Sequence, residues 1–521
     1  MNPEAFEQGL ADHDDRDFVQ YIVNACRYGV DIGFEGERQG LVSENWPSAT
    51  SCGGAVLKSI QDDLNKHRKL GPFNEVPFDN FVGSPMGAFA KKHSPDKYRV
   101  IYDLSFPPGR SVNDHIPIDK FSLTYMSIDE VVHAIQQYGR GALLSKLDLE
   151  SAFSHILVRP EDWELLGSSY WCSDCNCRHY LVNTVLNFGL RSSPSLFTDF
   201  AYAAMLIMKA QGVSYVNHYL DDYVTVGPPC SHICQKNLDI MMKVCNDVGF
   251  TINPSKLVQP TTCIEFLGIV LDSERLELRI SEERLRNILS ELAVWRHRKK
   301  ATKREILSLL GKLIFISRVV QSSRTFVRRI IQLSKKVKHL HHKVRLNREF
   351  QADIEWWLAF LPSWNGVAMF YDHEWITSSA MDFYSDASNV AVAGYWQGDW
   401  FVELTDTSHT IAWRELYAVV LAAATWAPAW SGRKILFHCD NMAVVQVLAS
   451  GSSKNPELMA LLRALFFIAA SYQFTFSSTY VNTKLNVVAD CLSRLDFYKF
   501  WSLVPGANWV MTTPGKVYLD V

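Results

Sequence analysis

Two adjacent carboxylates, Asp221 and Asp222, lie between two apolar stretches of the chain. Residues 213–219 and 223–226 are rich in β-branched and aromatic side chains, which predicts two strands joined by a tight turn that carries the aspartates. Like charges side by side are costly unless a cation neutralises them, so the pair indicates a divalent metal site. A solvated hairpin turn explains these residues equally well on their own, because Asp is a good turn former.

A third carboxylate, Asp148, ends another apolar stretch at residues 143–148. We expect a strand there, followed by a helix-compatible segment. A carboxylate at the end of a central strand that meets the Asp pair of another strand is what two-metal phosphoryl transfer requires. In such a site one ion activates the attacking hydroxyl and the other stabilises the leaving pyrophosphate.

Two further stretches are compatible with a nucleotide pocket. A basic turn at residues 91–99 precedes a predicted strand, and Lys92 and Arg99 are placed there to grip a triphosphate by point-charge and bidentate contacts. Gly189 and Pro194 bracket a turn into a predicted helix at residues 196–209, which can form the floor of that pocket. A solvated hairpin and a plain loop explain the two stretches as well.

Composition narrows the class of protein. Of the 521 residues 48% are hydrophobic and 21% are charged, which is ordinary globular composition for two to four domains. No run of 18 or more uncharged apolar residues occurs and the first residues are acidic, so we expect no membrane span and no signal peptide. The eleven cysteines are mostly isolated, which is typical of reduced thiols in an intracellular protein, cytoplasmic or nuclear.

The net charge of -3 conceals a strongly basic segment. Between Arg296 and Asn347 sixteen Lys or Arg residues accompany one acid, Glu305. This density is expected for contacts with nucleic-acid phosphates, although a solvated helix face carries charge in the same way. A capping box that pairs Thr302 with Glu305, followed by apolar residues at helical spacing, predicts that the segment is helical.

Three thiols and an imidazole gather at a predicted hairpin tip: Cys172, Cys175, Cys177 and His179. Four zinc ligands are therefore nominally available. The spacing is cramped and no second pair follows, which favours reduced surface thiols over a structural zinc.

The order of these pieces resembles the reverse transcriptase family. The basic hairpin, the strand ending in Asp148, the Phe-Gly-Leu turn at residues 188–190 and the Tyr-x-Asp-Asp hairpin come first. Gly-Phe-Thr-Ile-Asn-Pro-Ser-Lys at residues 249–256 and Phe-Leu-Gly-Ile at 266–269 complete the order. The resemblance implies a right-hand polymerase with fingers, palm and thumb, which extends a DNA primer on an RNA or DNA template with deoxynucleoside triphosphates.

The resemblance also implies the roles of individual residues. The catalytic carboxylates are Asp148, Asp221 and Asp222, which together with Leu149 hold two Mg²⁺ ions, or Mn²⁺ in their place. Phe153 takes the place of the bulky aromatic side chain that excludes a ribose 2'-hydroxyl. The implied substrate-binding residues are Lys92, Arg99, Phe153, Phe188, Gly189 and Lys256. The strand that holds the primer end contains Phe266, Leu267 and Gly268.

A second unit begins near Met381. Three predicted strands, a helix, a strand, two helices, a strand and a final helix resemble a ribonuclease H domain. Its expected carboxylates, at strand ends and on helix faces, are Asp386, Glu415, Asp440 and Asp490. The resemblance implies that these four hold two Mg²⁺ ions for hydrolysis of RNA in an RNA/DNA hybrid.

The predicted fold class is therefore α+β multidomain, a right-hand polymerase followed by an α/β ribonuclease H-like domain. The expected boundaries are a loosely ordered lead-in at 1–45, fingers and palm at 46–257, primer-grip strand and thumb at 258–346, a connector at 347–377, the ribonuclease H-like domain at 378–500 and a tail at 501–521.

Within the family the motifs at residues 71–73, 84–87 and 103–114 are most similar to DIRS-like retrotransposons within the long-terminal-repeat clade. The resemblance implies a tyrosine recombinase and a Gag-like protein of the same element as partners. Two alternatives stay open: a degenerate or repurposed copy that binds nucleic acid without catalysis, and an RNA-directed RNA polymerase. The aromatic side chain of Phe153 and the appended nuclease disfavour the second.

Overall fold

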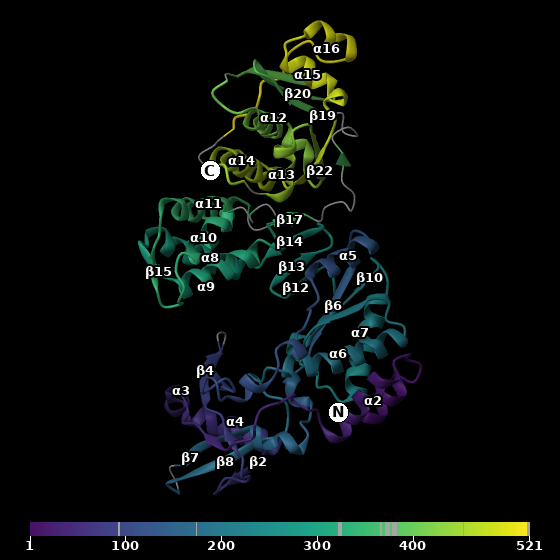
Figure 1. The fold of residues 1–521 in the computed structure, drawn as a ribbon. Coiled ribbons are helices and arrows are strands. Elements are labelled where there is room, and N and C mark those ends of the chain that lie inside the picture. The colour runs from purple at the N-terminus through teal and green to yellow at the C-terminus, as the bar shows by residue number, and fades with distance from the viewer. Residues whose placement is uncertain are drawn as a thin grey trace. The chain divides into compact units, whose positions relative to one another are not determined.

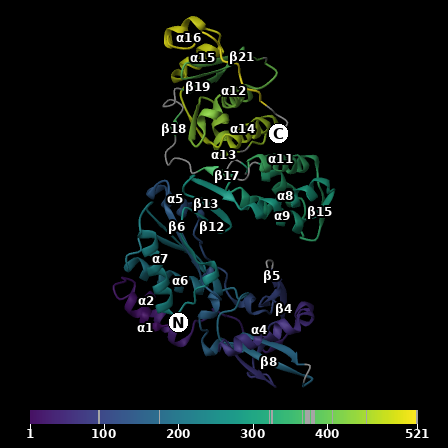
Figure 2. The same ribbon diagram turned by 180° about the vertical axis from the view of Figure 1, so that it is seen from behind.

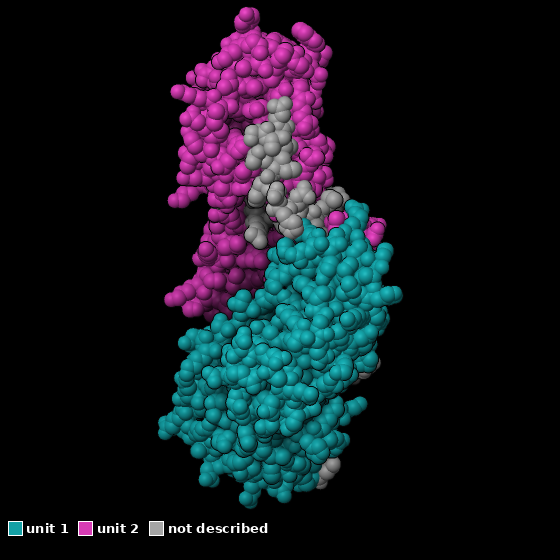
Figure 3. Space-filling model, turned by 90° about the vertical axis from the view of Figure 1, so that its right-hand side faces the viewer, with its two compact units in different colours: residues 1–264 teal, residues 265–521 magenta. Residues whose placement is uncertain are grey.

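The computed structural model describes residues 1–91, 94–172, 175–320, 323, 326–364, 367–369, 376–377, 383–405, 407–451 and 453–517. The chain divides into two compact units, residues 1–264 and 265–521, which Figure 3 colours separately. Each unit buries its own apolar core, so each is described by itself. Among the described residues no helix combines the length and the hydropathy that a bilayer crossing needs.

The N-terminal segment is helical and packed, so the prediction of a loosely ordered lead-in at residues 1–45 was wrong. Phe6 is fully buried and its ring lies 6.0 Å from that of Phe200. The second helix buries Val19, Ile22 and Val23 on one face, because apolar residues three and four apart share a side of a helix. The two helices are α1 (Pro3–Gly9) and α2 (Arg16–Tyr28).

The fingers contain a five-stranded sheet in the order β1-β3-β7-β8-β2 and a separate two-stranded ribbon, β4-β5. The ribbon is the basic hairpin expected from the sequence. Lys92 lies outside the described residues. The strands are β1 (Leu41–Val42), β2 (Lys69–Phe73), β3 (Val82–Gly83), β4 (Met86–Lys91), β5 (Ser94–Tyr102), β7 (Gly167–Cys172) and β8 (Cys177–Asn183), and the helices are α3 (Pro47–Ser51) and α4 (Gly53–Asn65).

The palm is a four-stranded sheet in the order β11-β6-β10-β9 (Figure 1). Helices α6 and α7 pack on it and bury the apolar residues between them and the strands. Strand β11 pairs with β6, so the expected boundary at 257/258 cuts through the palm sheet and the division lies at 264/265. The palm elements are α5 (Ile128–Tyr138), β6 (Leu143–Asp148), α6 (Ser193–Ala210), β9 (Val216–Tyr219), β10 (Asp222–Gly227), α7 (Ile233–Val248) and β11 (Val258–Thr261).

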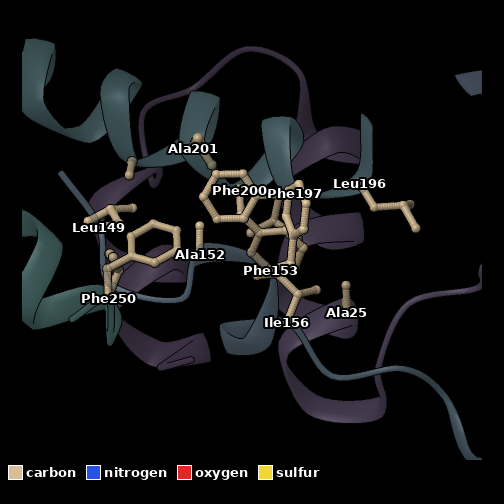
Figure 4. Packing of buried hydrophobic residues seen from close by; sticks show 14 of the residues in the cluster. Ala25, Leu149, Ala152, Phe153, Ile156, Leu196, Phe197, Phe200, Ala201 and Phe250 are labelled. Carbon is tan, nitrogen blue, oxygen red and sulfur yellow. The ribbon is translucent and has the colours of Figure 1, made fainter. Parts of the chain in front are cut away.

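A layer of aromatic rings lies under the palm helix α6 (Figure 4). The Phe153 ring lies 5.7 Å from that of Phe197, which in turn lies 5.8 Å from that of Phe250. Offset and edge-to-face ring pairs of this kind add about 0.5–1.5 kcal/mol beyond the burial of their area. The layer fixes the segment that follows Asp148 against the palm.

The second unit begins with a four-stranded sheet and a layer of helices. Leu267 (φ 51°) and Gly268 (φ 77°) form the turn between β12 and β13, so the Phe-Leu-Gly stretch is a hairpin rather than the single strand that was expected. Two residues with positive φ give a tight reversal. The elements are β12 (Cys263–Phe266), β13 (Ile269–Asp272), β14 (Glu277–Ile280), α8 (Glu282–His297), β15 (Lys300–Thr302), α9 (Lys303–Ile316), α10 (Arg328–Lys335), β16 (Lys343–Arg345), α11 (Arg348–Trp364) and β17 (Val367–Met369).

The expected connector at 347–377 is not a separate element over its described part. Helix α11 packs against α8 and α10, with the Phe350 ring 5.7 Å from that of Trp295. The capping box at the start of α9 is present as predicted, with Thr302 and Glu305 exchanging hydrogen bonds.

The remainder of this unit has two three-stranded sheets, β19-β20-β21 and β18-β22-β23. Helices α12 and α14 pack side by side over a shared apolar core (Figures 1 and 2). The elements are β18 (Ile376–Thr377), β19 (Phe383–Ala387), β20 (Ala391–Trp396), β21 (Asp399–Leu404), α12 (Ile411–Trp426), β22 (Lys434–Cys439), α13 (Met442–Ser450), α14 (Pro456–Ser471), β23 (Thr475–Tyr480), α15 (Val487–Ser493) and α16 (Phe497–Leu503).

The C-terminal segment is part of this domain, so the predicted boundary at 500/501 was wrong. Helix α16 crosses it and buries Phe500. Beyond the helix, the Trp400 indole nitrogen donates to the carbonyl oxygen of Asn508 at 2.7 Å, and the Thr512 amide donates to the carbonyl oxygen of Trp400 at 2.8 Å. These bonds fasten the segment to β21.

A buried ion cluster joins α10, α11 and α14. The fully buried Asp353 accepts from Arg463 at 2.7 Å and from Arg329 at 3.4 Å. Burial outweighs both arginines and raises the pKa of Asp353 to about 6. The Arg463 guanidinium also lies 4.3 Å from the centre of the Phe326 ring.

We expect Asp353→Ala to destabilise the second unit by about 3–5 kcal/mol, because it leaves the buried Arg463 without its counter-charge. Urea unfolding of the full chain measures this. In the control, Asp353→Leu is combined with Arg463→Met, which removes both charges and should restore most of the lost free energy of unfolding. An equal loss in the single and the double variant would show that packing rather than charge dominates here.

Candidate active sites

The aspartate pair lies in a two-residue turn between β9 and β10. Asp222 pairs with Tyr219 across the hairpin, which leaves Leu220 and Asp221 as the turn residues. Leu220 has a φ of 52°, and a left-handed conformation at the first turn position suits the twist of a two-residue hairpin. The Leu220 side chain packs against the core of the first unit. The predicted strand-turn-strand is therefore confirmed.

The register between β6 and β10 brings the third aspartate to this turn. Asp148 lies directly opposite Asp222, and the Leu149 amide donates to the carbonyl oxygen of Asp221 at 3.1 Å. Opposite residues of an antiparallel pair carry their side chains on the same face of the sheet. The three carboxyl-bearing residues predicted from the sequence are thus neighbours.

Two residues of the 249–256 stretch hold the Asp148 carboxylate. The Lys256 ammonium contacts Asp148 Oδ1 at 2.7 Å, and the Asn253 side-chain amide donates to Asp148 Oδ2 at 3.3 Å. The Asn253 main-chain amide also donates to the Asp148 carbonyl oxygen at 2.8 Å. Asn253 was not among the predicted site residues, although its place in the Gly-Phe-x-Ile-Asn-Pro-Ser-Lys stretch could have indicated it.

The electrostatics of the cluster favour a bound cation. Burial, and then repulsion from Asp148 and Asp221, raises the pKa of Asp222. Burial also raises the pKa of Asp221. The Lys256 ammonium supplies a positive charge beside Asp148. Burial lowers the pKa of Lys256, but the hydrogen bond to Asp148 and the charges of the acids raise it overall. Adjoining carboxylate oxygens that need a positive partner fit a hard divalent ion such as Mg²⁺.

A cleft of about 870 Å³ opens beside these carboxylates in the first unit. Its lining includes three residues predicted to bind substrate: Arg99, Phe188 and Lys256. Asp148, Leu149 and Asp221 line it as well. The exposed guanidinium of Arg99 comes from β5 of the basic hairpin. The cleft therefore combines acidic and basic side chains in one lining.

Two aromatic side chains lie one behind the other beside the cleft. The Phe188 ring is 48% exposed, and the Phe153 ring, 8% exposed, lies 4.8 Å behind it. Gly189 follows with a φ of 103°, and a Cβ there would lie 2.4 Å from the carbonyl oxygen of Tyr102. The backbone of β5 therefore requires glycine at this position.

A second cluster of carboxylates forms in the second unit. Asp386 comes from strand β19, Glu415 from α12 and Asp440 from the residue after β22. One carboxylate oxygen of each lies within 4.8 Å of the others. Burial raises the pKa of both Asp386 and Glu415, and the neighbouring acids raise them further. Three converging acidic oxygens, two of them on carboxyls with raised pKa values, Asp386 and Glu415, are a donor set that Mg²⁺ fits.

The fourth predicted acid, Asp490, lies on α15 beside this cluster. Its charge raises the pKa of Asp386, while its own carboxylate accepts from Arg494 Nε at 2.6 Å. One turn further along, Ser493 Oγ donates to Asp386 Oδ2 at 2.5 Å. Ser493 was not predicted, and its spacing of three residues from Asp490 on one helix is the signal that could have found it.

The raised pKa values predict how pH and metal change stability. A carboxyl whose pKa is raised on folding binds protons more tightly in the folded state, so metal-free stability falls as pH rises above the unfolded value of about 4. A divalent ion removes this penalty. We therefore expect Mg²⁺ to raise the melting temperature of the second unit more at about pH 8 than at about pH 5. Differential scanning calorimetry with EDTA or Mg²⁺ tests this, and an equal shift in an Asp386→Asn, Glu415→Gln variant would contradict it.

Two family models match the chain over the ranges that contain these clusters. One, described as "Reverse transcriptase (RNA-dependent DNA polymerase)", matches residues 90–271. Another, described as "Reverse transcriptase-like", matches residues 396–495.

Solved structures share the fold of this chain over most of its length. The foamy viral protease-reverse transcriptase in complex with double-stranded DNA has a TM-score of 0.50 and 14% identity, over 93% of this chain and 98% of that one. A second structure of that viral protein with double-stranded DNA has a TM-score of 0.52 and 13% identity, over 91% and 81%. These likenesses show the fold of the chain, a right-hand polymerase followed by an α/β ribonuclease H-like domain.

A viral polyprotein is also similar to about half of the chain. Polyprotein P3 of Commelina yellow mottle virus is 23% identical over 265 residues, which is 51% of this chain. The chain spans 12% of the length of that polyprotein. The fold class predicted from the sequence is confirmed by these comparisons together.

Proposed function

We propose that the first unit synthesises DNA on an RNA or DNA template. The observation that carries this is the register that sets Asp148 opposite Asp222 at the edge of a cleft lined by Arg99 and Lys256. Acidic side chains that can bind two Mg²⁺ ions and basic side chains that can bind a triphosphate then line the same cleft. Bound Mg²⁺, or Mn²⁺, would activate the primer hydroxyl and neutralise the leaving pyrophosphate.

The chain's own residues position the reactants. Asn253 and Lys256 hold the Asp148 carboxylate in place, and the exposed Arg99 is available to bind triphosphate oxygens in bidentate fashion. The hairpin of Phe266, Leu267 and Gly268 and the basic helices of the second unit would contact the primer and the duplex backbone. Phosphate contacts of this kind are independent of sequence.

We propose that the second unit cleaves RNA in an RNA/DNA hybrid. Asp386, Glu415 and Asp440 would hold the ions, with Asp490 completing the set from α15. Ser493 orients Asp386 through its hydroxyl, and a fixed carboxylate orientation is what a metal site needs from the residues around its ligands.

A binding protein without catalysis is the rival function. Primer extension on poly(rA)/oligo(dT) with Mg²⁺ and then Mn²⁺ tests it, with hybrid cleavage measured on the same preparation. We expect both activities from the full chain. Tight binding of the hybrid with neither activity would favour the rival.

Phe153 supports a preference for deoxynucleotides, which distinguishes this function from RNA-directed RNA synthesis. We expect Phe153→Val to increase ribonucleotide relative to deoxynucleotide incorporation at least ~10-fold, within the range that pocket shape alone supplies. The ratio of kcat/KM for the two nucleotides measures this. Phe197→Val, one layer deeper, is the control, because it makes the same change in side-chain volume in the buried core. An unchanged ratio in Phe153→Val would remove Phe153 from the specificity pocket.

We further propose that the chain is the polymerase and nuclease part of a DIRS-like retrotransposon. The support is the set of motifs at residues 71–73, 84–87 and 103–114. A tyrosine recombinase and a Gag-like protein would then be its partners, inside the cell. Co-purification of the full chain with the two proteins of the same element tests this.

A further inference from the structure

The tip of the β7–β8 hairpin collects soft metal ligands outside both carboxylate clusters. Cys172 pairs with Cys177, and Tyr170 pairs with His179, in the register of these strands. Opposite residues and residues two apart share a face of an antiparallel pair. Cys172, Cys177 and His179 therefore lie on one face of the hairpin, and this is the juxtaposition that the linear spacing hides.

The fourth ligand reaches this face through the turn. Asn176 has a φ of 51°, a conformation that Asn tolerates better than most residues. Cys175 Sγ lies 2.8 Å from Cys177 Sγ and 3.2 Å from His179 Nε2. Cys177 Sγ lies 3.6 Å from the same nitrogen.

We propose that Cys172, Cys175, Cys177 and His179 bind Zn²⁺ at the tip of the fingers hairpin. One ligand atom each of Cys172, Cys175 and His179 lies within 4.8 Å of the others. In a tetrahedral site with Zn–S near 2.3 Å and Zn–N near 2.0 Å, neighbouring ligand atoms lie about 3.5–3.8 Å apart. The observed sulfur-to-nitrogen distances of 3.2 and 3.6 Å are close to that, and the two sulfurs of Cys175 and Cys177 would move apart by about 1 Å.

The ligand chemistry selects the metal. Thiolates and an imidazole prefer Zn²⁺ to the hard ions that carboxylate clusters bind. Four protein ligands leave no open position, which is typical of a structural rather than a catalytic zinc. The spacing of the cysteines alone favoured reduced surface thiols over zinc. The hairpin register adds the convergence of ligands that spacing cannot show.

The surroundings of the cluster hold its scaffold in place. The His179 ring lies 5.4 Å from that of Tyr170, and Arg178 forms an ion pair with Glu44 at 2.5 Å. Cys175 is exposed and Cys172 and Cys177 are half-buried, so a metal can enter from solvent. A bound ion would hold the ends of β7 and β8 together at the tip of their hairpin.

The test is the metal content of the reduced full chain. After removal of metal with EDTA and reconstitution with Zn²⁺, mass spectrometry of the metals should find one equivalent of zinc that survives dialysis. The Co²⁺-loaded chain should show the visible and charge-transfer bands of tetrahedral thiolate ligation, which carboxylate clusters do not produce. Cys175→Ser and His179→Ala should abolish both signals.

Cys230→Ser provides the matched control, because Cys230 is also exposed but lies away from the cluster. It should retain the zinc and the cobalt bands. Zinc retained equally in Cys175→Ser, or no zinc in the wild type, would overturn the proposal. So would a disulfide between Cys175 and Cys177, found by mass spectrometry, that persists under the reducing conditions used for loading.

Discussion

Replacing Asp148 and Asp221 by asparagine abolishes primer extension, by our account, and leaves the cleavage of RNA in a hybrid intact. The register of β6 and β10 places both residues at the same turn, so the double change removes two charged ligands of the proposed metals. We expect extension to fall by about 10³-fold or more, which is ~4 kcal/mol of transition-state stabilisation. Time courses of extension and of cleavage on one preparation measure both.

Folding should survive this substitution. It removes the two acids whose charges, together with burial of Asp222 itself, raise the pKa of Asp222. The Lys256 side chain is 57% exposed, so it stays solvated when Asp148 no longer pairs with it. The melting temperature should therefore stay the same or rise. Asp247→Asn on the exposed side of α7, where Asp247 pairs with Lys243, is the control for loss of a carboxylate outside the cluster. Loss of both activities, or of neither, would refute the division of labour between the units.

The reciprocal result is expected for Asp386→Asn. Asp386 accepts a hydrogen bond from the Ser493 hydroxyl. It also lies beside the carboxylates of Glu415 and Asp440. Hybrid cleavage should fall by about 10³-fold or more while primer extension is unchanged. Gel analysis of a labelled RNA strand in the hybrid measures the cleavage rate.

Two further variants sharpen this second prediction. Ser493→Ala should reduce cleavage less than Asp386→Asn, because it removes the orientation of a ligand rather than the ligand, about 10–100-fold. Glu457→Gln, an exposed acid in the first turn of α14, should leave cleavage unchanged. Full cleavage by Asp386→Asn would contradict the assignment of the carboxylate cluster.

The polymerase cluster was accessible to prediction because strand-forming residues are concentrated there. β-branched and aromatic residues on both sides of Asp221 and Asp222 indicated the hairpin, and the apolar stretch before Asp148 indicated the strand that meets it. What the sequence could not supply was the register, which makes Asp148 and Asp222 direct neighbours. Register depends on pairing between strands far apart in the chain.

The missed features differ in kind. The helical spacing of Val19, Ile22 and Val23 in α2 was visible in the sequence next to a cluster of acids. The prediction of a loosely ordered N-terminal segment was therefore an avoidable error. The C-terminal segment is held instead by main-chain bonds, such as that from the Thr512 amide to Trp400, which leave no residue pattern. The convergence of Cys172 and Cys177 likewise follows from strand pairing alone.

We propose that acids far apart in the sequence fold into two clusters, each of which binds divalent ions. Crystals of the full chain grown with Mn²⁺ test this, because anomalous scattering locates the ions without an activity assay. We predict peaks between Asp148, Asp221 and Asp222 and between Asp386, Glu415 and Asp440. Ordered carboxylates with no peak at either cluster, at a Mn²⁺ concentration that supports extension, would contradict the account.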